Sequence, residues 1–273
     1  MKTRILVAAL ACLAVGCADP GPARDHVAAL FELDPRAFHG APATAAQREL
    51  GERLFTTRLG EAACSDCHRL GDHGQDGRSH VRNTPALADV SRQLVLGWDG
   101  GEGDLGQMVA RELRDRCRVE DAQAVAALTA FLDGWRTRGR WDRYVEGDDG
   151  ALSGAERHGL ATFIEVGCAA CHAGRTLGGR SRHKLGAAAP FATVDTGLHA
   201  VTGRDADRYF FKAPMLRLAA RTGPWLHDGS VSDLREVVRL MARHELGREV
   251  SDAQVDAIVL FLQAAADVDE RTG

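Results

Sequence analysis

Two copies of one five-residue pattern, Cys-x-x-Cys-His, constrain this 273-residue chain more than any other feature. "CSDCH" occupies residues 64–68 and "CAACH" occupies residues 168–172. The similarity extends further, because a shift of 129 residues lays "NTPALADVSRQLVLGWDGGEGDL" on "KAPMLRLAARTGPWLHDGSVSDL" without a gap, taking Pro85 to Pro214. A repeat of this size indicates that one structural unit occurs twice along the chain.

Apolar residues recur three and four positions apart, which predicts helices. The segments are 44–58, 104–116, 120–137, 153–166, 231–243 and 251–265. Thr44 and Ser153 each stand three positions before Gln or Glu, as in a capping box. No segment alternates convincingly like a strand. We therefore expect an all-α fold of two tandem domains, residues 43–150 and 151–273, that meet at the acidic, glycine-containing stretch 146–151.

The N-terminal segment is typical of an export signal. Residues 1–16 carry two cations followed by an apolar run, and small residues precede Cys17. "LAVGC" also resembles the lipobox of bacterial lipoproteins, so both lipidation of Cys17 and ordinary cleavage nearby stay open. We expect a periplasmic protein, with a lipid anchor as one possibility and residues 17–42 as a linker. A net charge of −4 gives no reason to expect a nucleic-acid partner.

The Cys-x-x-Cys-His pattern is the attachment motif of c-type haem, in which two thioether bonds hold the porphyrin and the histidine binds its iron. Zinc is the weaker reading, because pairs of cysteines a hundred residues apart make a poor tetrahedron. A thioredoxin-like dithiol would need a βαβ setting. The aromatic content of 5% also leaves room for a bulky apolar cofactor in the interior. We expect one haem in each domain, and Cys117 as a buried apolar residue.

The ligand on the opposite face of each iron decides what each haem can do. His68 and His172 supply one face. The repeat places Met241 in the second copy where the first copy has Glu112. A thioether raises the reduction potential and suits electron transfer, so Met241 is the expected ligand of the second haem. Glu112 is either an acid/base group over the first iron or a solvated helix carboxylate beside arginines.

Two further places in the first copy bear on the chemistry. His80 and His73 follow the first motif, and either could cap the first haem reversibly or be a solvated loop histidine. Trp98 stands in "GWDGG" where the second copy has His227. Its indole is either an electron relay between the haems or ordinary aromatic packing.

With these residues assembled, the chain resembles the bacterial di-haem cytochrome c peroxidases, a family that includes the di-haem enzymes of methylamine utilisation. The resemblance runs from about residue 45 to 266, is densest over residues 195–241, and includes "VRNTPAL" and "GWDGG". It implies a low-potential, peroxide-reacting haem on the first motif and a high-potential haem on the second. The residues implied are Cys64, Cys67 and His68 for the first haem, Cys168, Cys171, His172 and Met241 for the second, Trp98 between them, and His227 in the "HDG" motif.

The resemblance also implies a calcium ion between the domains, held by the side chain of Asn83 and the backbone oxygens of Thr222 and Pro224. Hard oxygen ligands suit that ion. The loop between His68 and Asn83 is shorter than is usual in the family, and the segment that normally carries the catalytic glutamate is missing. Glu112 is therefore argued from the repeat alone.

The function expected is reduction of hydrogen peroxide to water with electrons from a small cytochrome c or cupredoxin. Trp98, Glu112 and His80 would take part, and a homodimer is possible because dimers are common in the family that the chain resembles. Two alternatives stand beside this one: a di-haem electron carrier with no reaction of its own, and an oxidase of a protein or small organic substrate. The methylamine enzymes resemble this chain less, since they replace the distal methionine by tyrosine.

Overall fold

The computed structural model describes residues 21–31, 43–72, 74 and 82–272. The predicted signal segment, Cys17, His73 and His80 lie outside these residues. The helices are α1 (Arg24–Phe31), α2 (Ala45–Thr56), α3 (Leu105–Glu112), α4 (Ala122–Gly134), α5 (Arg140–Val145), α6 (Gly154–Val166), α7 (His199–Thr202), α8 (Leu234–Leu246) and α9 (Asp252–Ala265). The strands are β1 (Arg136–Gly139), β2 (Arg182–Lys184), β3 (Phe210–Lys212) and β4 (Val268–Thr272). No helix in the described part of the chain is long and apolar enough to cross a membrane.

The structure confirms the repeat. Helix α3 begins at Leu105 after the cap Asp104, and α8 begins at Leu234 after the cap Asp233. An isolated bridge joins Leu96 to Glu102 in the first copy, and another joins Trp225 to Val231 at the equivalent places in the second. The predicted capping boxes of Thr44 and Ser153 are both formed. The six predicted helices correspond to α2, α3, α4, α6, α8 and α9.

Each copy is built on one close helix pair. Helix α2 packs on α4, and α6 packs on α9. Gly51 lies where a Cβ atom would come within 2.0 Å of the Ala127 carbonyl oxygen, and Gly159 where a Cβ would come within 2.1 Å of the Ala257 carbonyl oxygen. Each helix pair therefore has one glycine whose lack of a side chain allows the two helix backbones to touch.

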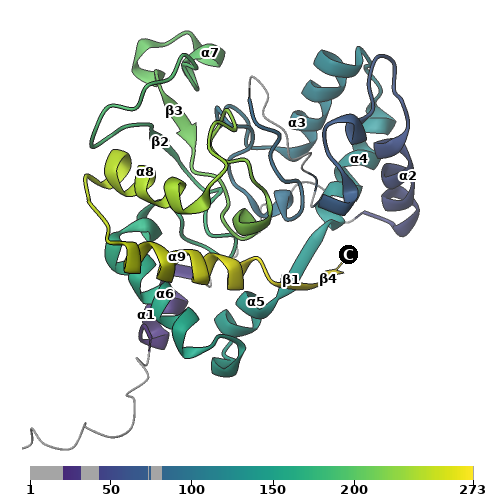
Figure 1. The fold of residues 1–273 in the computed structure, drawn as a ribbon. Coiled ribbons are helices and arrows are strands. Elements are labelled where there is room, and N and C mark those ends of the chain that lie inside the picture. Colours follow the sequence, from purple (N-terminus) through teal and green to yellow (C-terminus); the bar gives the residue numbers. More distant parts are fainter. Residues whose placement is uncertain (1–20, 32–42, 73, 75–81, 273) are drawn as a thin grey trace, which may run out of the picture.

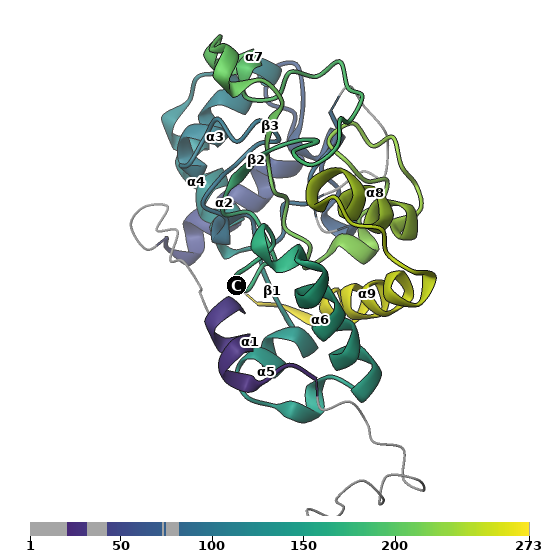
Figure 2. The ribbon, with the colours of Figure 1, turned by 90° about the vertical axis from the view of Figure 1, so that its left-hand side faces the viewer.

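The buried side chains form two hydrophobic cores. One core lies between α2, α3 and α4 and is centred on Phe55, Phe131 and Trp135. The other lies among α1, α5, α6 and α9 and includes Trp141 and Phe261. Figures 1 and 2 show the first group of helices at one end of the molecule and the second group at the other. Helix α1 comes from the segment expected as a linker, and it buries Val27 and Phe31 in the second core.

Four short strands form in the described residues, although no segment of the sequence alternates convincingly like a strand. β1 pairs antiparallel with β4, and β2 pairs antiparallel with β3. These strands are three to five residues long; β1, β2 and β3 lie between helices, and β4 follows α9. "RTRG" in β1 shows no apolar alternation, because its buried positions are Thr137 and Gly139 rather than large apolar residues. The fold remains all-α in class, with two small ribbons added.

A buried polar cluster lies between the two cores. Arg217 is 0% exposed and donates to Asp142 and, over 3.0 Å, to the Thr137 hydroxyl. Its Nε also lies 3.4 Å from Asp89, which is likewise 0% exposed. Thr137 donates its backbone N–H and its hydroxyl to the same Asp89. Charges buried so deeply are tolerated because each has partners of opposite sign.

Candidate haem-binding sites

Both Cys-x-x-Cys-His segments adopt one local geometry. A single 3₁₀ turn starts at Cys64 in the first copy and at Cys168 in the second. In each, the histidine N–H donates to the carbonyl of the first cysteine, over 2.9 Å for His68 and 3.0 Å for His172. None of these four cysteines forms a disulfide bond. The turn therefore presents two thiols and an imidazole together, as haem attachment requires.

The protonation of these thiols argues against a reactive dithiol. Burial raises the pKa of Cys64 to about 11 and that of Cys168 to about 12. Thiol exchange needs the thiolate, which burial disfavours here. The described residues also contain no group of three His, Cys, Asp or Glu side chains arranged to hold a metal ion. Two cysteines followed directly by a histidine are the donor set of a covalently attached porphyrin.

Both histidines are held with one ring nitrogen turned to the backbone. Nδ1 of His172 lies 3.0 Å from the Pro214 oxygen and 3.2 Å from the Leu177 oxygen, and Nδ1 of His68 lies 2.6 Å from the Gly74 oxygen. A carbonyl can only accept, so Nδ1–H donates and Nε2 keeps its lone pair. Burial lowers the pKa of His172 to about 4, so this imidazole is neutral at physiological pH. That tautomer is the one that binds iron through Nε2.

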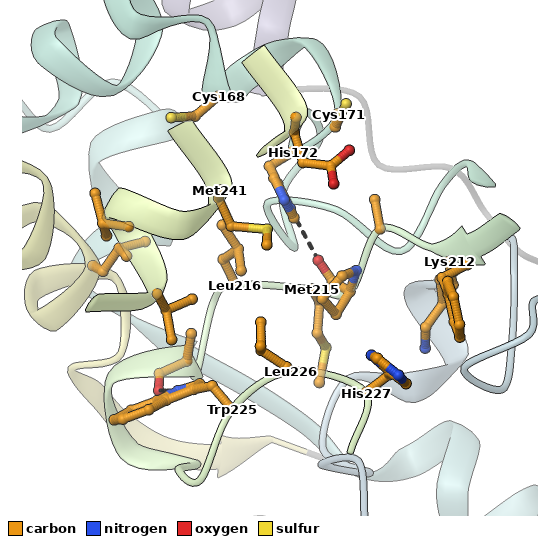
Figure 3. Close-up of a pocket in the computed structure, with 18 of the residues that line it drawn as sticks. Cys168, Cys171, His172, Lys212, Met215, Leu216, Trp225, Leu226, His227 and Met241 are labelled. Carbon is orange, nitrogen blue, oxygen red and sulfur yellow. Dashed lines mark hydrogen bonds between the residues drawn. The ribbon is translucent and has the colours of Figure 1, made fainter. Parts of the chain in front are cut away.

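The second motif opens into an apolar cavity (Figure 3). Cys168, Cys171 and His172 line it, and Met241 on α8 extends its sulfur toward the same space. Most of the remaining wall is hydrophobic, including Phe163, Leu234, Val237, Val238, Ile258 and Leu262. An apolar cavity with two thiols, an oriented imidazole and a thioether fits a haem of the kind predicted.

The first motif lies against the other core, where Cys64 packs with the buried residues around α3 and α4. Glu112, the counterpart of Met241, has a side chain that is 48% exposed and is paired with Arg116 over 2.8 Å. Burial is the main cause of the raised pKa of Cys64, and the negative charge of Glu112 raises that pKa further. The helix changes here to a π-helical turn, Leu113–Cys117, which α8 does not have.

Trp98 lies between the two halves. It lines the cavity of the second motif together with Gln93 and Thr84 of the first half. Its indole N–H donates to the Asn83 carbonyl over 2.7 Å, and its own carbonyl accepts from the N–H of Lys212 over 2.9 Å. An aromatic ring is thus fixed at the boundary of the haem cavity.

The residues suggested for calcium come partly together. Asn83 is 5% exposed, and its amide nitrogen lies 2.6 Å from the Pro224 carbonyl oxygen. Its side-chain oxygen is buried without a hydrogen-bond partner among the described residues. Thr222 precedes Pro224 by two positions and lines the haem cavity. A buried amide oxygen without a hydrogen-bond partner is the kind of group that a hard cation would satisfy.

His227 is 5% exposed and is oriented by its surroundings. Its Nε2 lies 3.0 Å from the Thr193 hydroxyl, its ring packs on Phe211 at 4.6 Å between centroids, and its carbonyl accepts from the Asn83 N–H over 2.7 Å. Burial lowers the pKa of His227. The imidazole is therefore a neutral group at the boundary between the halves.

Sequence reasoning missed three side chains of this cavity. Lys212, Gln93 and Met215 all line it, and the first two are 6% and 1% exposed. A lysine inside the apolar run "FFKAP" is a signal that could have drawn attention to Lys212. Gln93 offers no such signal, because its burial depends on contact with the other half.

A scan against models of known protein families finds no match. The chain is 30% identical over 268 residues to cytochrome c551 peroxidase of Nitrosomonas europaea, covering 81% of this chain and 80% of that protein. It is 28% identical to cytochrome c551 peroxidase of Pseudomonas aeruginosa, covering 88% of this chain and 85% of that protein. It is also 25% identical to the methylamine utilization protein MauG of Methylophilus methylotrophus, with 82% and 83% covered.

Solved structures agree on the fold. A MauG-like protein associated with microbial copper homeostasis superposes with a TM-score of 0.70 at 23% identity, covering 83% of this chain and 90% of that one. The di-haem peroxidase BthA of Burkholderia thailandensis superposes with a TM-score of 0.63 at 18% identity, covering 85% and 88%. The all-α, two-domain fold is therefore common to these chains.

Proposed function

Because this chain belongs to the family of bacterial di-haem cytochrome c peroxidases, we propose that it reduces hydrogen peroxide to water with electrons from a small redox protein. The chain is an oxidoreductase that carries two c-type haems, one on each Cys-x-x-Cys-His motif. The haems supply the one-electron chemistry and the reaction with peroxide. The protein contributes attachment, orientation and surroundings that differ between the two.

One observation carries the proposal: the two haem sites are unequal at equivalent positions. Met241 directs a thioether into the cavity opposite His172, whereas Glu112 is an ion-paired carboxylate near Cys64. Thioether ligation closes an iron to small ligands and raises its potential. This difference supports an electron-transfer role for the second site and peroxide binding at the first. Met241 also favours a peroxidase over the tyrosine-ligated methylamine enzymes.

The chain's other groups have separable roles in this proposal. The apolar wall of the second cavity excludes water, and Trp98 lies at its boundary with the first half, where electrons must cross. Glu112 would move a proton at the first site, as a positioned carboxylate does in general acid/base catalysis. His80, or His73 in its place, would cap the first site at rest. The domains would be residues 43–150 and 151–273, with α5 of the first packing into the core of the second.

Calcium would be held by Asn83 through its side chain and by the backbone oxygens of Thr222 and Pro224. The buried, unpartnered oxygen of Asn83 supports this ligand. A bound cation there would fix the contact between Asn83 and the loop that contains Pro224 and His227. Its role would be to hold the two halves in register.

The donor proposed is a cytochrome c or a cupredoxin in the periplasm. Lipidation at Cys17 would tie the protein to a membrane surface, and pairing with a second copy would give a homodimer. These proposals come from the export-type N-terminal sequence and from the family.

The test is stopped-flow mixing of the purified di-haem protein with hydrogen peroxide and a reduced cytochrome c or cupredoxin. We expect peroxide-dependent oxidation of about two donor molecules per peroxide, because reduction of peroxide to water takes two electrons. Exchange of electrons with the donor without peroxide consumption would identify a carrier instead. Peroxide-dependent oxidation of an added protein or amine, with no donor turnover, would identify an oxidase like the methylamine enzymes.

A further inference from the structure

Lys212 is a buried cation in the wall of the second haem cavity. It ends β3, is 6% exposed, and lines the cavity together with His172 and Met241. In Figure 3 it lies near His227, on the side of the cavity away from Cys168. The chain contains three lysines, Lys2, Lys184 and Lys212, among 34 cationic residues.

The protein's own contacts do not neutralise this ammonium group. Its Nζ donates to Oε1 of Gln93 over 2.8 Å, which is a neutral acceptor. No carboxylate of the described residues lies within ion-pair distance of Nζ. The charge of Asp99 raises the pKa of Lys212 only from further away. Burial accordingly lowers the pKa of Lys212 to about 8. An ammonium has three donors, and burying it with one neutral acceptor is unfavourable unless an anion is close.

A haem attached at this motif would supply an anion, because it carries two carboxylates. A c-type haem is fixed at one edge by its thioether bonds, and its two carboxylates lie at the edge away from them. Cys168 and Cys171 set the first edge at one side of this cavity, and Lys212 occupies the wall across from Cys168. The cavity is otherwise lined mainly by apolar side chains, so Lys212 is a fitting partner for a carboxylate there.

We propose that Lys212 binds a carboxylate of the second haem and, through its positive charge, raises that haem's reduction potential. A nearby cation stabilises the reduced form, which carries one more electron. The effect adds to that of Met241, and it acts at the boundary with the first half. Gln93, from the first half, holds the Nζ, and the backbone N–H of Lys212 donates to the Trp98 carbonyl.

The inference deepens the proposed function, since it concerns the electron-transfer role of the second haem. Its readouts need no peroxide. A failure of peroxide reduction would therefore leave it standing, and a failure of the potential to respond would leave peroxide reduction standing.

The experiment compares the potentials of the second haem in Lys212→Met, Lys212→Arg and Lys184→Met by spectroelectrochemistry of the di-haem protein. Lys184 is an exposed lysine on the adjacent strand β2, so its loss removes the same charge without touching the cavity. We expect Lys212→Met to lower the equilibrium constant for reduction about tenfold, which is about 59 mV for one electron. Lys212→Arg and Lys184→Met should stay close to the wild type. Resonance Raman bands of the haem carboxylates should shift in Lys212→Met alone.

An unchanged potential in Lys212→Met, or an equal change in Lys184→Met, would overturn the inference. If Lys212→Met does not fold or does not acquire its haems, NMR of the wild-type protein tests the same inference. With lysine side chains labelled by ¹³C at Cε, the Lys212 signal should move when the second iron is oxidised, while that of Lys184 should not. A Lys212 ¹³C chemical shift that is the same in both redox states of the second iron would also refute the proposal.

Discussion

Met241 and Glu112 stand at equivalent positions of α8 and α3, yet they meet different surroundings. Met241 is partly buried and faces the haem cavity, while Glu112 is exposed and pairs with Arg116. The π-helical turn that starts at Leu113 belongs to α3's side of the repeat alone. A single position thus gives one haem site a soft sulfur donor and leaves the other without one.

Replacing Met241 by histidine should lower the potential of the second haem and slow turnover with peroxide. The expected fall is on the order of 0.1 V, within the roughly 0.8 V that axial ligands span. Spectroelectrochemistry measures the potential, and steady-state donor oxidation measures turnover. Met215→Leu is the matched control, because Met215 lines the same cavity. An unchanged potential in Met241→His would remove Met241 from its proposed role.

At the scale of elements, the crossing of α6 with α9 depends on Gly159, and that of α2 with α4 on Gly51. Alanine in a helix is ordinarily about 1 kcal/mol more favourable than glycine. Here the added methyl would meet the backbone of the partner helix, which cannot turn aside as a side chain would. Packing therefore outweighs helix propensity at these two positions.

Gly159→Ala should destabilise the protein by about 1–3 kcal/mol, because the helices must separate to admit the methyl group. Chemical denaturation followed by circular dichroism measures the free energy of unfolding. Gly71→Ala is the control, since a Cβ there has no neighbour within 4 Å. Equal stabilities of the two variants would show that the backbones can move apart without cost.

The helices and the haem attachment could be predicted because their signals are local. Caps, apolar periodicity and the Cys-x-x-Cys-His spacing are each contained in a short stretch of sequence. The strands could not be, because β1 finds its partner β4 only in the folded chain. The role of Lys212 could not be predicted for the same reason, because its burial and its contact with Gln93 arise only when two distant segments pack together.

For the molecule as a whole, the cluster of Arg217, Asp89 and Asp142 joins the two halves through buried charge. Arg217 comes from the second half, and Asp89 from the first. Buried ion pairs add little net stability when complete, but the loss of one partner leaves the others uncompensated. The cluster therefore favours one arrangement of the halves, because any arrangement that separated its members would leave a buried charge uncompensated.

Arg217→Met should cost about 3–5 kcal/mol in the free energy of unfolding, because two buried carboxylates lose a partner. Arg221→Met removes an exposed arginine paired with Asp267 over 3.5 Å and should cost at most about 1 kcal/mol. Denaturant unfolding of the two variants gives the comparison. Similar losses in both would mean that water reaches the cluster around Arg217.

Arg82 forms a second bridge between the halves, and it predicts a dependence on pH. Burial tends to raise the pKa of Asp195, but hydrogen bonds from Arg82 and the Gly197 N–H outweigh it and lower that pKa. The depressed pKa adds stability that is present at neutral pH and is lost as the pH falls below about 4. Asp195→Asn should be less stable at pH 7 and lose less stability on acidification.

Unfolding measured from pH 7 to pH 3 tests this, with Asp205→Asn as the control because the Asp205 side chain is 86% exposed. If Asp195→Asn lost stability with acid as steeply as the wild type, the bridge of Arg82 would have no part in the acid response.

The pairing of β1 with β4 means that the first half of the chain is not a self-sufficient unit. β1 follows directly on α4, yet its hydrogen-bonding edge stays open until residues 268–272 arrive, nearly half a chain length later. A polypeptide truncated or cleaved between the halves would expose an unpaired strand edge beside an apolar core. Such an edge promotes aggregation. Dissecting the protein into one-haem pieces should therefore begin by supplying β4 as a separate peptide or by grafting it onto the first half.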